Sequence, residues 1–120
     1  MNALIEKQSG KLIGYAGLLM QTVDEKTELE VAYSLRPDYR NQGFAAEAAA
    51  KCCDFAFENS FAESLISIIS LTNSPSAKVA IKNGMKIEKQ TVYKENRVNI
   101  FRVHRSDWLE KSLTLVHGFK

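Results

Sequence analysis

Cysteine and proline are scarce in this 120-residue chain, which contains two of each. Because Cys52 and Cys53 are adjacent and alone, they provide neither a disulfide framework nor the spaced ligands of a zinc site. Long apolar runs are also absent: no segment approaches the ~20 residues that span a bilayer, and residues 1–7 contain no signal-peptide core. We therefore expect a cytoplasmic protein with reduced thiols on a helix, no membrane segment and no metal site.

An excess of charge of one sign is missing as well. The chain has 16 Lys and Arg against 14 Asp and Glu, a net charge of +2, which gives no electrostatic reason to expect a nucleic acid or an anionic membrane as partner. The 45% of hydrophobic residues is typical of a globular protein. Since most domains have ~100–150 residues, residues 1–120 are expected to form a single domain.

Six segments show the alternation or the β-branched residues of strands. The clearest is 28–35, which alternates apolar and small or polar residues and ends just before Pro37, a residue that cannot donate to a sheet ladder. The run 65–71 is rich in isoleucine and suits a strand covered on both faces. The other strands are expected in two hairpins, 2–7 with 11–20 around Ser9-Gly10 and 86–94 with 97–104 across Glu95-Asn96.

Two helices are predicted between these strands. Residues 45–59 have one narrow polar stripe and are otherwise Ala, Cys and Phe, so this helix should be largely buried against a sheet. The stripe consists of Glu47, Lys51, Asp54 and Glu58. A second helix is expected at 74–83, with Asn73 or Ser74 as N-cap and Gly84 at its C-terminal end. A short last helix should begin near Ser106.

The order of these elements is β-β-β-α-β-α-β-β, which predicts an α/β fold around a mixed sheet. The segment most suggestive of chemistry is 35–45, where a strand ends and a polar loop with Gly43 leads directly into the buried helix. Unpaired N–H groups and the helix dipole make such a helix start suitable for an anion. Arg40 adds a cation. The spacing alone fits an ordinary βα connection equally well, because neither GxxxxGK[ST] nor GxGxxG is present.

Two motifs in this order resemble those of the GNAT superfamily of N-acetyltransferases. Arg40-x-x-Gly43-x-Ala45 is similar to the family's R/Q-x-x-G-x-G/A sequence, and Asn73-Ser74-Pro75-Ser76 with the later Lys82-Asn83-Gly84 is similar to its second signature. The segments 12–17 and 29–33 resemble strands of the subgroup that includes the ribosomal-protein N-terminal (Rim-type) acetyltransferases. The resemblance covers roughly residues 2–108. It implies a GNAT-like fold, a mixed and mostly antiparallel sheet flanked by helices.

The resemblance further implies acetyl-CoA as co-substrate and a primary amine as acceptor, either a protein N-terminus or a small molecule. Glu30 would be the base that accepts the amine proton, and Ser76 the donor to the departing thiolate. The residues implied in cofactor binding are Ser34, Leu35, Arg40, Asn41, Gln42, Gly43, Phe44, Ala45, Asn73 and Ser76. The residues themselves leave other interpretations open, since Glu30 could be an exposed strand carboxylate and Ser76 a helix serine bonding locally.

The sequence departs from the family pattern at two points. Many members have a tyrosine acid where this chain has Ala80, although the Rim-type subgroup commonly lacks it. The chain also starts at what resembles the family's second strand, so the elements that wall the acceptor site are expected to be missing. A sheet without its first strand would favour a homodimer through the open edge. The alternative function is a GNAT-like domain that binds CoA or a partner without catalysis.

Overall fold

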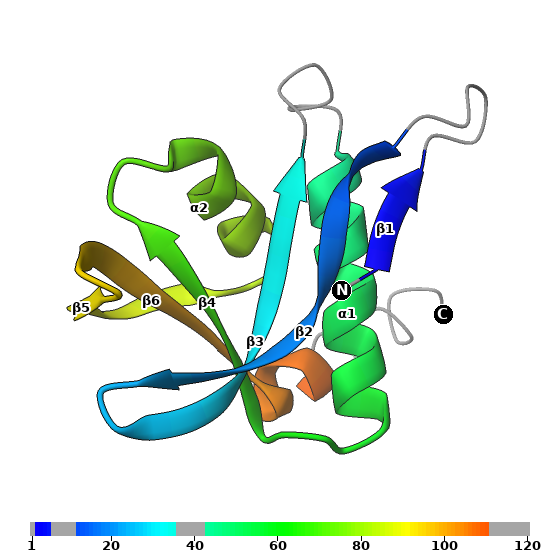
Figure 1. The fold of residues 1–120 in the computed structure, drawn as a ribbon. Coiled ribbons are helices and arrows are strands. Elements are labelled where there is room, and N and C mark those ends of the chain that lie inside the picture. The colour runs from blue at the N-terminus through cyan, green and yellow to red at the C-terminus, as the bar shows by residue number, and fades with distance from the viewer. Residues whose placement is uncertain (1, 6–11, 36–42, 111–120) are drawn as a thin grey trace.

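The computed structural model describes residues 2–5, 12–35 and 43–110, and the side chains within 14–34 and 43–110. Figure 1 shows the elements in order. They are β1 (Asn2–Ile5), β2 (Leu12–Val23), β3 (Lys26–Leu35), α1 (Phe44–Glu58), β4 (Ser64–Ser70), α2 (Ser74–Lys82), β5 (Lys86–Tyr93) and β6 (Asn96–His104). Residues 105–110 are helical. The predicted order of elements is therefore confirmed.

The strands form one six-stranded sheet in the order β1-β2-β3-β4-β6-β5. Every neighbouring pair is antiparallel except β3 with β4, which are parallel. This mixed, mostly antiparallel sheet with its helices is the predicted fold class. In the part of the chain that the structure describes, no helix is long and apolar enough to cross a bilayer.

The parallel strands β3 and β4 meet at a single pair of residues, Glu30 and Ile66. One residue further along β3 the ladder has ended, and the Ser67 hydroxyl donates to the Val31 carbonyl at 2.7 Å instead. Beyond this point the two strands spread apart toward their C-terminal ends (Figure 1). We call the space between residues 31–35 and 67–70 the wedge. It lies between strands that remain firmly paired on their outer sides.

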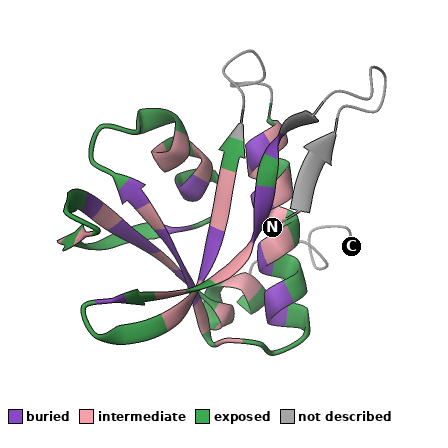
Figure 2. Cartoon of the chain, in the orientation of Figure 1, coloured by how far each residue is buried: buried purple, intermediate pink, exposed green. Residues whose placement is uncertain are grey.

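The main core lies between the sheet and the helices (Figure 2). α1 contributes Ala49, Cys53, Ala56 and Phe57, and the sheet contributes Val31, Leu65, Ile69, Phe101 and Val103. The predicted polar stripe of α1 is exposed along its whole length. Cys53 is buried and Cys52 half-buried, and both are free thiols. The amphipathic pattern thus determines which side of α1 faces the sheet.

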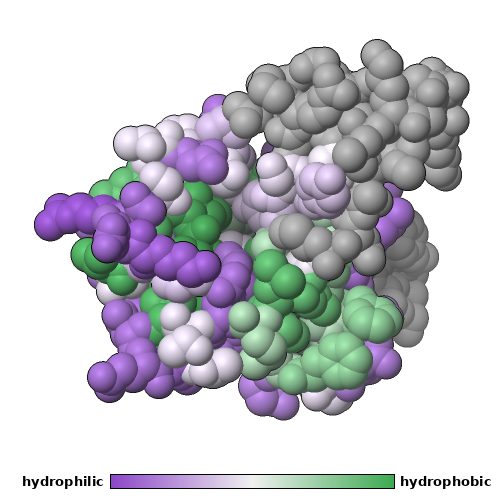
Figure 3. Space-filling view, in the orientation of Figure 1, coloured by the Kyte–Doolittle hydropathy of each residue, from purple (hydrophilic) through white to green (hydrophobic). Residues whose placement is uncertain are grey.

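A smaller core lies on the opposite face of the sheet and consists of Val23, Ile66, Val98 and Ile100. It is buried without a helix of the described chain because the tip of the β2–β3 hairpin reaches β5. There Asp24 accepts from the Thr91 hydroxyl at 2.9 Å and pairs with Lys89 at 3.0 Å. Exposed apolar surface lies instead near the end of α1 (lower right in Figure 3), where Phe55 and Phe61 pack edge to face at 5.5 Å.

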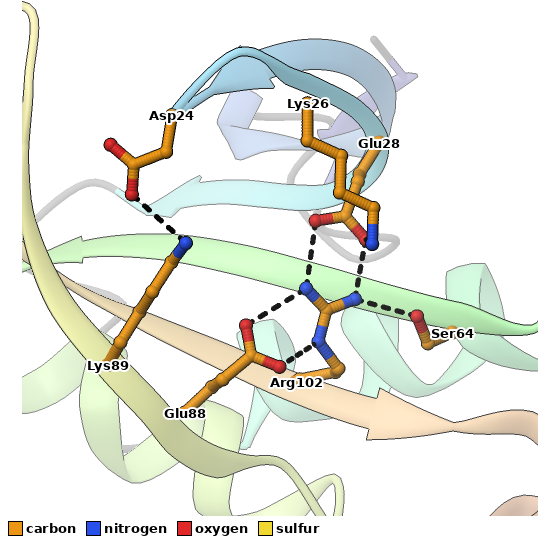
Figure 4. Close-up of polar contacts among 7 residues, drawn as sticks. All are labelled: Asp24, Lys26, Glu28, Ser64, Glu88, Lys89 and Arg102. Atoms are coloured by element: carbon orange, nitrogen blue, oxygen red, sulfur yellow. Dashed lines mark hydrogen bonds and ion pairs between the residues drawn. The ribbon is translucent and has the colours of Figure 1, made fainter.

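Arg102 on β6 ties four strands together on this second face (Figure 4). Its guanidinium forms bidentate pairs with Glu28 on β3, at 2.5 and 2.8 Å, and with Glu88 on β5, at 2.6 and 3.0 Å. A further N–H donates to the Ser64 hydroxyl of β4 at 2.7 Å. These contacts use all five N–H donors that an arginine has. Arg102 therefore holds the two halves of the sheet together where backbone pairing between β3 and β4 is minimal.

Two hairpin turns have positive φ at both central residues. The strand β2 ends at Val23 and β3 begins at Lys26, so Asp24 and Glu25 form a turn that was not predicted from the sequence. The strand β5 turns into β6 at Lys94-Glu95 rather than at the predicted Glu95-Asn96. The φ values are 48° and 68° in the first turn and 49° and 68° in the second, the property of type I′ turns. The second turn was misplaced by one residue because Lys94 and Glu95 are not the Gly, Asn or Asp residues that normally mark such a turn.

Glycine should suit this turn better than glutamate. We expect Glu25→Gly to stabilise the chain by about 1 kcal/mol and to raise its Tm by about 4 °C, because glycine adopts positive φ without the Cβ clash. Thermal unfolding followed by circular dichroism would measure the change. As a control, Gln90→Gly on exposed β5 should lower Tm, since strand backbone gains nothing from glycine. A decrease for Glu25→Gly would contradict the expectation.

Candidate functional site

A cavity of about 170 Å³ lies beside the end of β3, between the start of α1 and the length of α2, and none of the described residues of β4 lines it. It brings together the described residues of the two motifs, which are 30 positions apart in sequence from Gly43 to Asn73. The lining residues are Tyr33, Ser34, Gly43, Ala45, Ala46, Asn73, Pro75, Ser76, Lys78, Val79 and Lys82. Of the predicted cofactor residues, the structure thus gathers Ser34, Gly43, Ala45, Asn73 and Ser76 around one space.

Tyr33 joins the two sides of this cavity. Its hydroxyl donates to the backbone carbonyl of Ser76 at 2.6 Å, so the side chain reaches from β3 to the first turn of α2. Burial and the nearby Glu30 charge raise the pKa of Tyr33, which keeps the phenol protonated and able to donate. Because the hydrogen bond fixes α2 relative to β3, Tyr33 helps to set the width of the cavity.

The N-terminus of α1 forms another side of the cavity. Gly43 precedes the helix with φ +82° and provides no capping side chain. The first N–H groups of a helix have no intrahelical acceptor, and the helix dipole places partial positive charge there. A Cβ atom built on Gly43 would meet no atom of the described residues within 4 Å, its chain neighbours apart, so on their side the space beside this backbone is open. Backbone N–H groups next to open space can receive an anionic group such as a phosphate.

The start of α2 uses its polar groups differently from one another. Asn73 is the N-cap, and its side-chain oxygen accepts from the Ser76 backbone N–H at 3.2 Å. The Ser76 hydroxyl forms no hydrogen bond with any other described residue, although Ser76 lines the cavity. The alternative interpretation of Ser76 was a serine that forms local hydrogen bonds, and the local hydrogen bond that it does form, with Asn73, uses its backbone N–H.

Two lysines add positive charge to the cavity. Lys78 and Lys82 lie one turn apart on the exposed side of α2, and both line the space next to Ser76 and Val79. Their spacing of four residues places them on the same face of the helix, but nothing in the spacing shows that this face borders the cavity. Together with the start of α1 they make the cavity suitable for a ligand that carries several negative charges.

Glu30 lies at the closed end of the wedge, where β3 and β4 pair, and not among the residues that line the cavity. We call this closed end the vertex. Glu30 is only 7% exposed, so the interpretation as an exposed strand carboxylate is wrong. One carboxylate oxygen accepts from the Ile68 backbone N–H at 2.9 Å and the other from the Gln21 amide at 3.1 Å. Burial raises the pKa of Glu30, although these hydrogen bonds and the Lys94 charge act in the opposite direction. Ser34, on the same face of β3, is four residues or roughly 13 Å away along the strand.

Several predicted site residues are not placed at the cavity. Arg40, Asn41 and Gln42 lie outside the described residues, and of Leu35 only the backbone, the last residue of β3, is described. Phe44 begins α1 but is not among the described residues that line the cavity. His104 is exposed at the end of β6, as expected for a strand-surface residue. Among the described residues, no group of three His, Cys, Asp or Glu side chains could hold a metal ion.

Comparison with known proteins agrees with this geometry. Residues 1–86 match the family model described as an acetyltransferase (GNAT) domain. The Bacillus subtilis (strain 168) protein YkkB, which is described as uncharacterized, is 30% identical over 92 residues, or 77% of this chain and 53% of that protein. The chain therefore spans about half the length of this relative.

Solved structures show the same fold. An acetyltransferase from Agrobacterium tumefaciens str. C58 is 28% identical with a TM-score of 0.66, over 81% of this chain and 56% of that one. The ribosomal-protein-S5-alanine acetyltransferase from Vibrio fischeri is 19% identical with a TM-score of 0.72, over 88% of this chain and 61% of that one.

Proposed function

The chain belongs to the GNAT family of acetyltransferase domains, and on this premise we propose that it transfers the acetyl group of acetyl-CoA to a primary amine. The observation that supports this most strongly is the wedge. β3 and β4 pair only at Glu30 and Ile66, and the cavity beside the diverging end of β3 is bordered by the start of α1, where Gly43 provides no capping side chain. An extended chain with a phosphate-bearing end fits between such strands with its anionic part at the helix.

In this proposal the pyrophosphate of the cofactor lies at Gly43 and Ala45, with Arg40, Asn41, Gln42 and Phe44 as further contacts. The pantetheine arm extends along the wedge past Ser34, Leu35 and Asn73. Lys78 and Lys82 border the same cavity and add charge of the sign that phosphates need. The thioester then lies toward the vertex, where backbone N–H groups of the diverging strands can stabilise its oxygen.

The reaction proposed is direct transfer. The nitrogen of the neutral amine attacks the thioester carbonyl carbon, a C–N bond forms, and collapse of the intermediate breaks the C–S bond. Glu30 accepts the proton that the nitrogen loses, and the Ser76 hydroxyl donates a proton to the CoA thiolate. A carboxylate is an effective base near neutral pH only if its pKa is raised. Burial at the vertex raises the pKa of Glu30, which supports this assignment.

Glu30→Gln should lower kcat by about 100-fold at pH 6 and by less at pH 9, because general base catalysis is lost while alkaline solution deprotonates the amine unaided. Initial rates across this pH range would measure the effect. Glutamine can keep the hydrogen bond from Ile68, so folding should be retained. Glu47→Gln, on the exposed stripe of α1, is the matched control and should leave the profile unchanged. An equal loss at all pH values would remove Glu30 from the role of base.

Binding and turnover are tested separately. Titration calorimetry with acetyl-CoA tests the cofactor assignment, and the absence of heat and of thermal stabilisation at millimolar cofactor would contradict it. Thiol release with small-molecule amines and with peptides bearing free N-termini then tests transfer and distinguishes the two acceptor classes. Binding without thiol release from any acceptor would favour a CoA-binding domain without catalysis. A cytoplasmic location and a homodimer are part of the proposal, and light scattering would test the latter.

A further inference from the structure

A chain of hydrogen bonds leads from the β5–β6 hairpin to Glu30. The Tyr93 hydroxyl, at the end of β5, donates to the side-chain oxygen of Gln21 on β2 at 2.6 Å. The amide nitrogen of Gln21 in turn donates to Glu30 at 3.1 Å. All three side chains are buried or half-buried. The contact between Tyr93 and Gln21 joins residues that are 72 positions apart in sequence.

The direction of this chain follows from the chemistry of its groups. An ionised carboxylate only accepts hydrogen bonds, so Gln21 must present its NH2 group to Glu30 and its oxygen to Tyr93. Tyr93 must then be the donor. If Glu30 takes up a proton, the hydrogen bonds can reverse: the carboxyl donates to the side-chain oxygen of Gln21, whose amide has turned, and the Gln21 NH2 group donates to the Tyr93 oxygen. This set of hydrogen bonds can therefore satisfy the buried carboxyl in both protonation states.

The charge that acts on Glu30 comes from the same hairpin. Lys94, next to Tyr93, holds its ammonium 5.2 Å from the Tyr93 ring, and its charge favours the ionised form of Glu30. The hydrogen bond from the Ile68 N–H of β4 also favours the ionised form of Glu30. Tyr33 lies on the other face of β3 and is a protonated, uncharged phenol. Gln21 is the side-chain donor to Glu30 from β2.

We propose that Gln21 and Tyr93 are positioning residues for Glu30. Together they hold the Glu30 carboxylate in place at the vertex of the wedge and set its proton affinity. The inference rests on the proposed function, in which Glu30 is the base. It assigns part of the control of this base to the β5–β6 hairpin, which lies at the far edge of the sheet from β1.

The test follows the Glu30 carboxyl carbon directly by NMR titration of the ¹³C-glutamate-labelled chain, with Glu30→Gln identifying the signal. Gln21→Met removes the donor at nearly constant volume, and Tyr93→Phe removes only the hydroxyl. Both should move the Glu30 midpoint to higher pH, because a hydrogen bond to the ionised form is weakened or lost. Both should also lower kcat/KM at pH 6 by roughly tenfold, the equivalent of one hydrogen bond to a charged group.

Thr91→Val is the matched control. It removes another hydrogen bond between β5 and the β2–β3 hairpin, the 2.9 Å contact with Asp24, which does not lead to Glu30. This variant should leave the midpoint in place. An unmoved midpoint in both Gln21→Met and Tyr93→Phe would overturn the proposal, as would an equal shift in Thr91→Val. A moved midpoint with an unchanged pH–rate profile would support the positioning role and contradict Glu30 as base, so the two failures are distinguishable.

Discussion

Replacing Arg102 by methionine is expected to lower the free energy of unfolding by about 3 kcal/mol, a large part of the ~5–15 kcal/mol that stabilises a typical domain. The guanidinium is 9% exposed and Glu28 13% exposed, so this pair is largely removed from solvent. Without Arg102, two carboxylates face each other, and the ion pair that remains to Glu28 is the one with the exposed Lys26 at 3.7 Å. Breaking a buried ion pair typically costs about 3–5 kcal/mol, and we expect the lower end of this range because the Glu88 side chain is 39% exposed.

The same substitution should change the pH dependence of stability. In the native chain Arg102 holds the pKa values of Glu28 and Glu88 below their usual range. Their contribution is therefore present above the ordinary carboxyl pKa and is lost as the pH falls through the lowered native values. In the variant, repulsion between the carboxylates is relieved by protonation, so acidification favours folding. The stability gap between the two chains should narrow from pH 7 to pH 4.

Urea denaturation at a series of pH values would measure both effects. Lys51→Met is the control, because its pair with Glu47 joins side chains that are 76% and 67% exposed. Exposed pairs of this kind contribute at most about 0.5 kcal/mol. A loss for Arg102→Met as small as that of the control, or a gap that widens on acidification, would show that Arg102 does not hold the sheet together.

Gly43→Ala is expected to raise the Kd for acetyl-CoA at least about tenfold, equivalent to 1.4 kcal/mol or more. Its φ of +82° is strained for any residue with a Cβ atom. The added methyl would also project into the open space in which the pyrophosphate is proposed to approach the helix. Calorimetric titration measures the change in affinity, and urea denaturation measures the accompanying loss of stability.

Gly84→Ala separates these two effects. Gly84, after α2, has nearly the same φ of +81°, and a Cβ there would meet only Val103 Cγ2 at 4.0 Å. Both substitutions should therefore cost a similar ~1–2 kcal/mol of stability, while only Gly43→Ala weakens cofactor binding. Equal affinities in the two variants would contradict the placement of the pyrophosphate at α1.

Much of the fold could be predicted from local patterns. The polar stripe of α1 identified its exposed side, and Asn73, Pro75 and Gly84 marked the ends of α2 to within a residue. The Asp24-Glu25 turn was not predicted and the β5–β6 turn was misplaced by one residue, because Glu25, Lys94 and Glu95 adopt positive φ although they are not residues that prefer it. Their conformation is imposed by strand pairing on both sides, which no local propensity encodes.

The site was predictable only where a motif marks it. Gly43, Asn73 and Ser76 were identified and lie at one cavity. Tyr33 was missed because alternation alone assigns it to the core, and only the hydrogen bond to α2 shows that it borders the wedge. Lys78 and Lys82 were missed because a solvent-facing lysine and a cavity-lining lysine have the same helical position. Glu30 is linked through Gln21 to Tyr93, which is 63 residues further along the chain, and no local pattern encodes that link.

The central claim is that acetyl-CoA lies in the wedge between β3 and β4. A crystal structure of the chain with acetyl-CoA tests it most directly. We expect difference density for the pyrophosphate at the first turn of α1, for the pantetheine arm along Ser34 and past Asn73, and for the thioester toward Glu30. Density for the cofactor at any other surface, with the wedge occupied only by solvent, would contradict it.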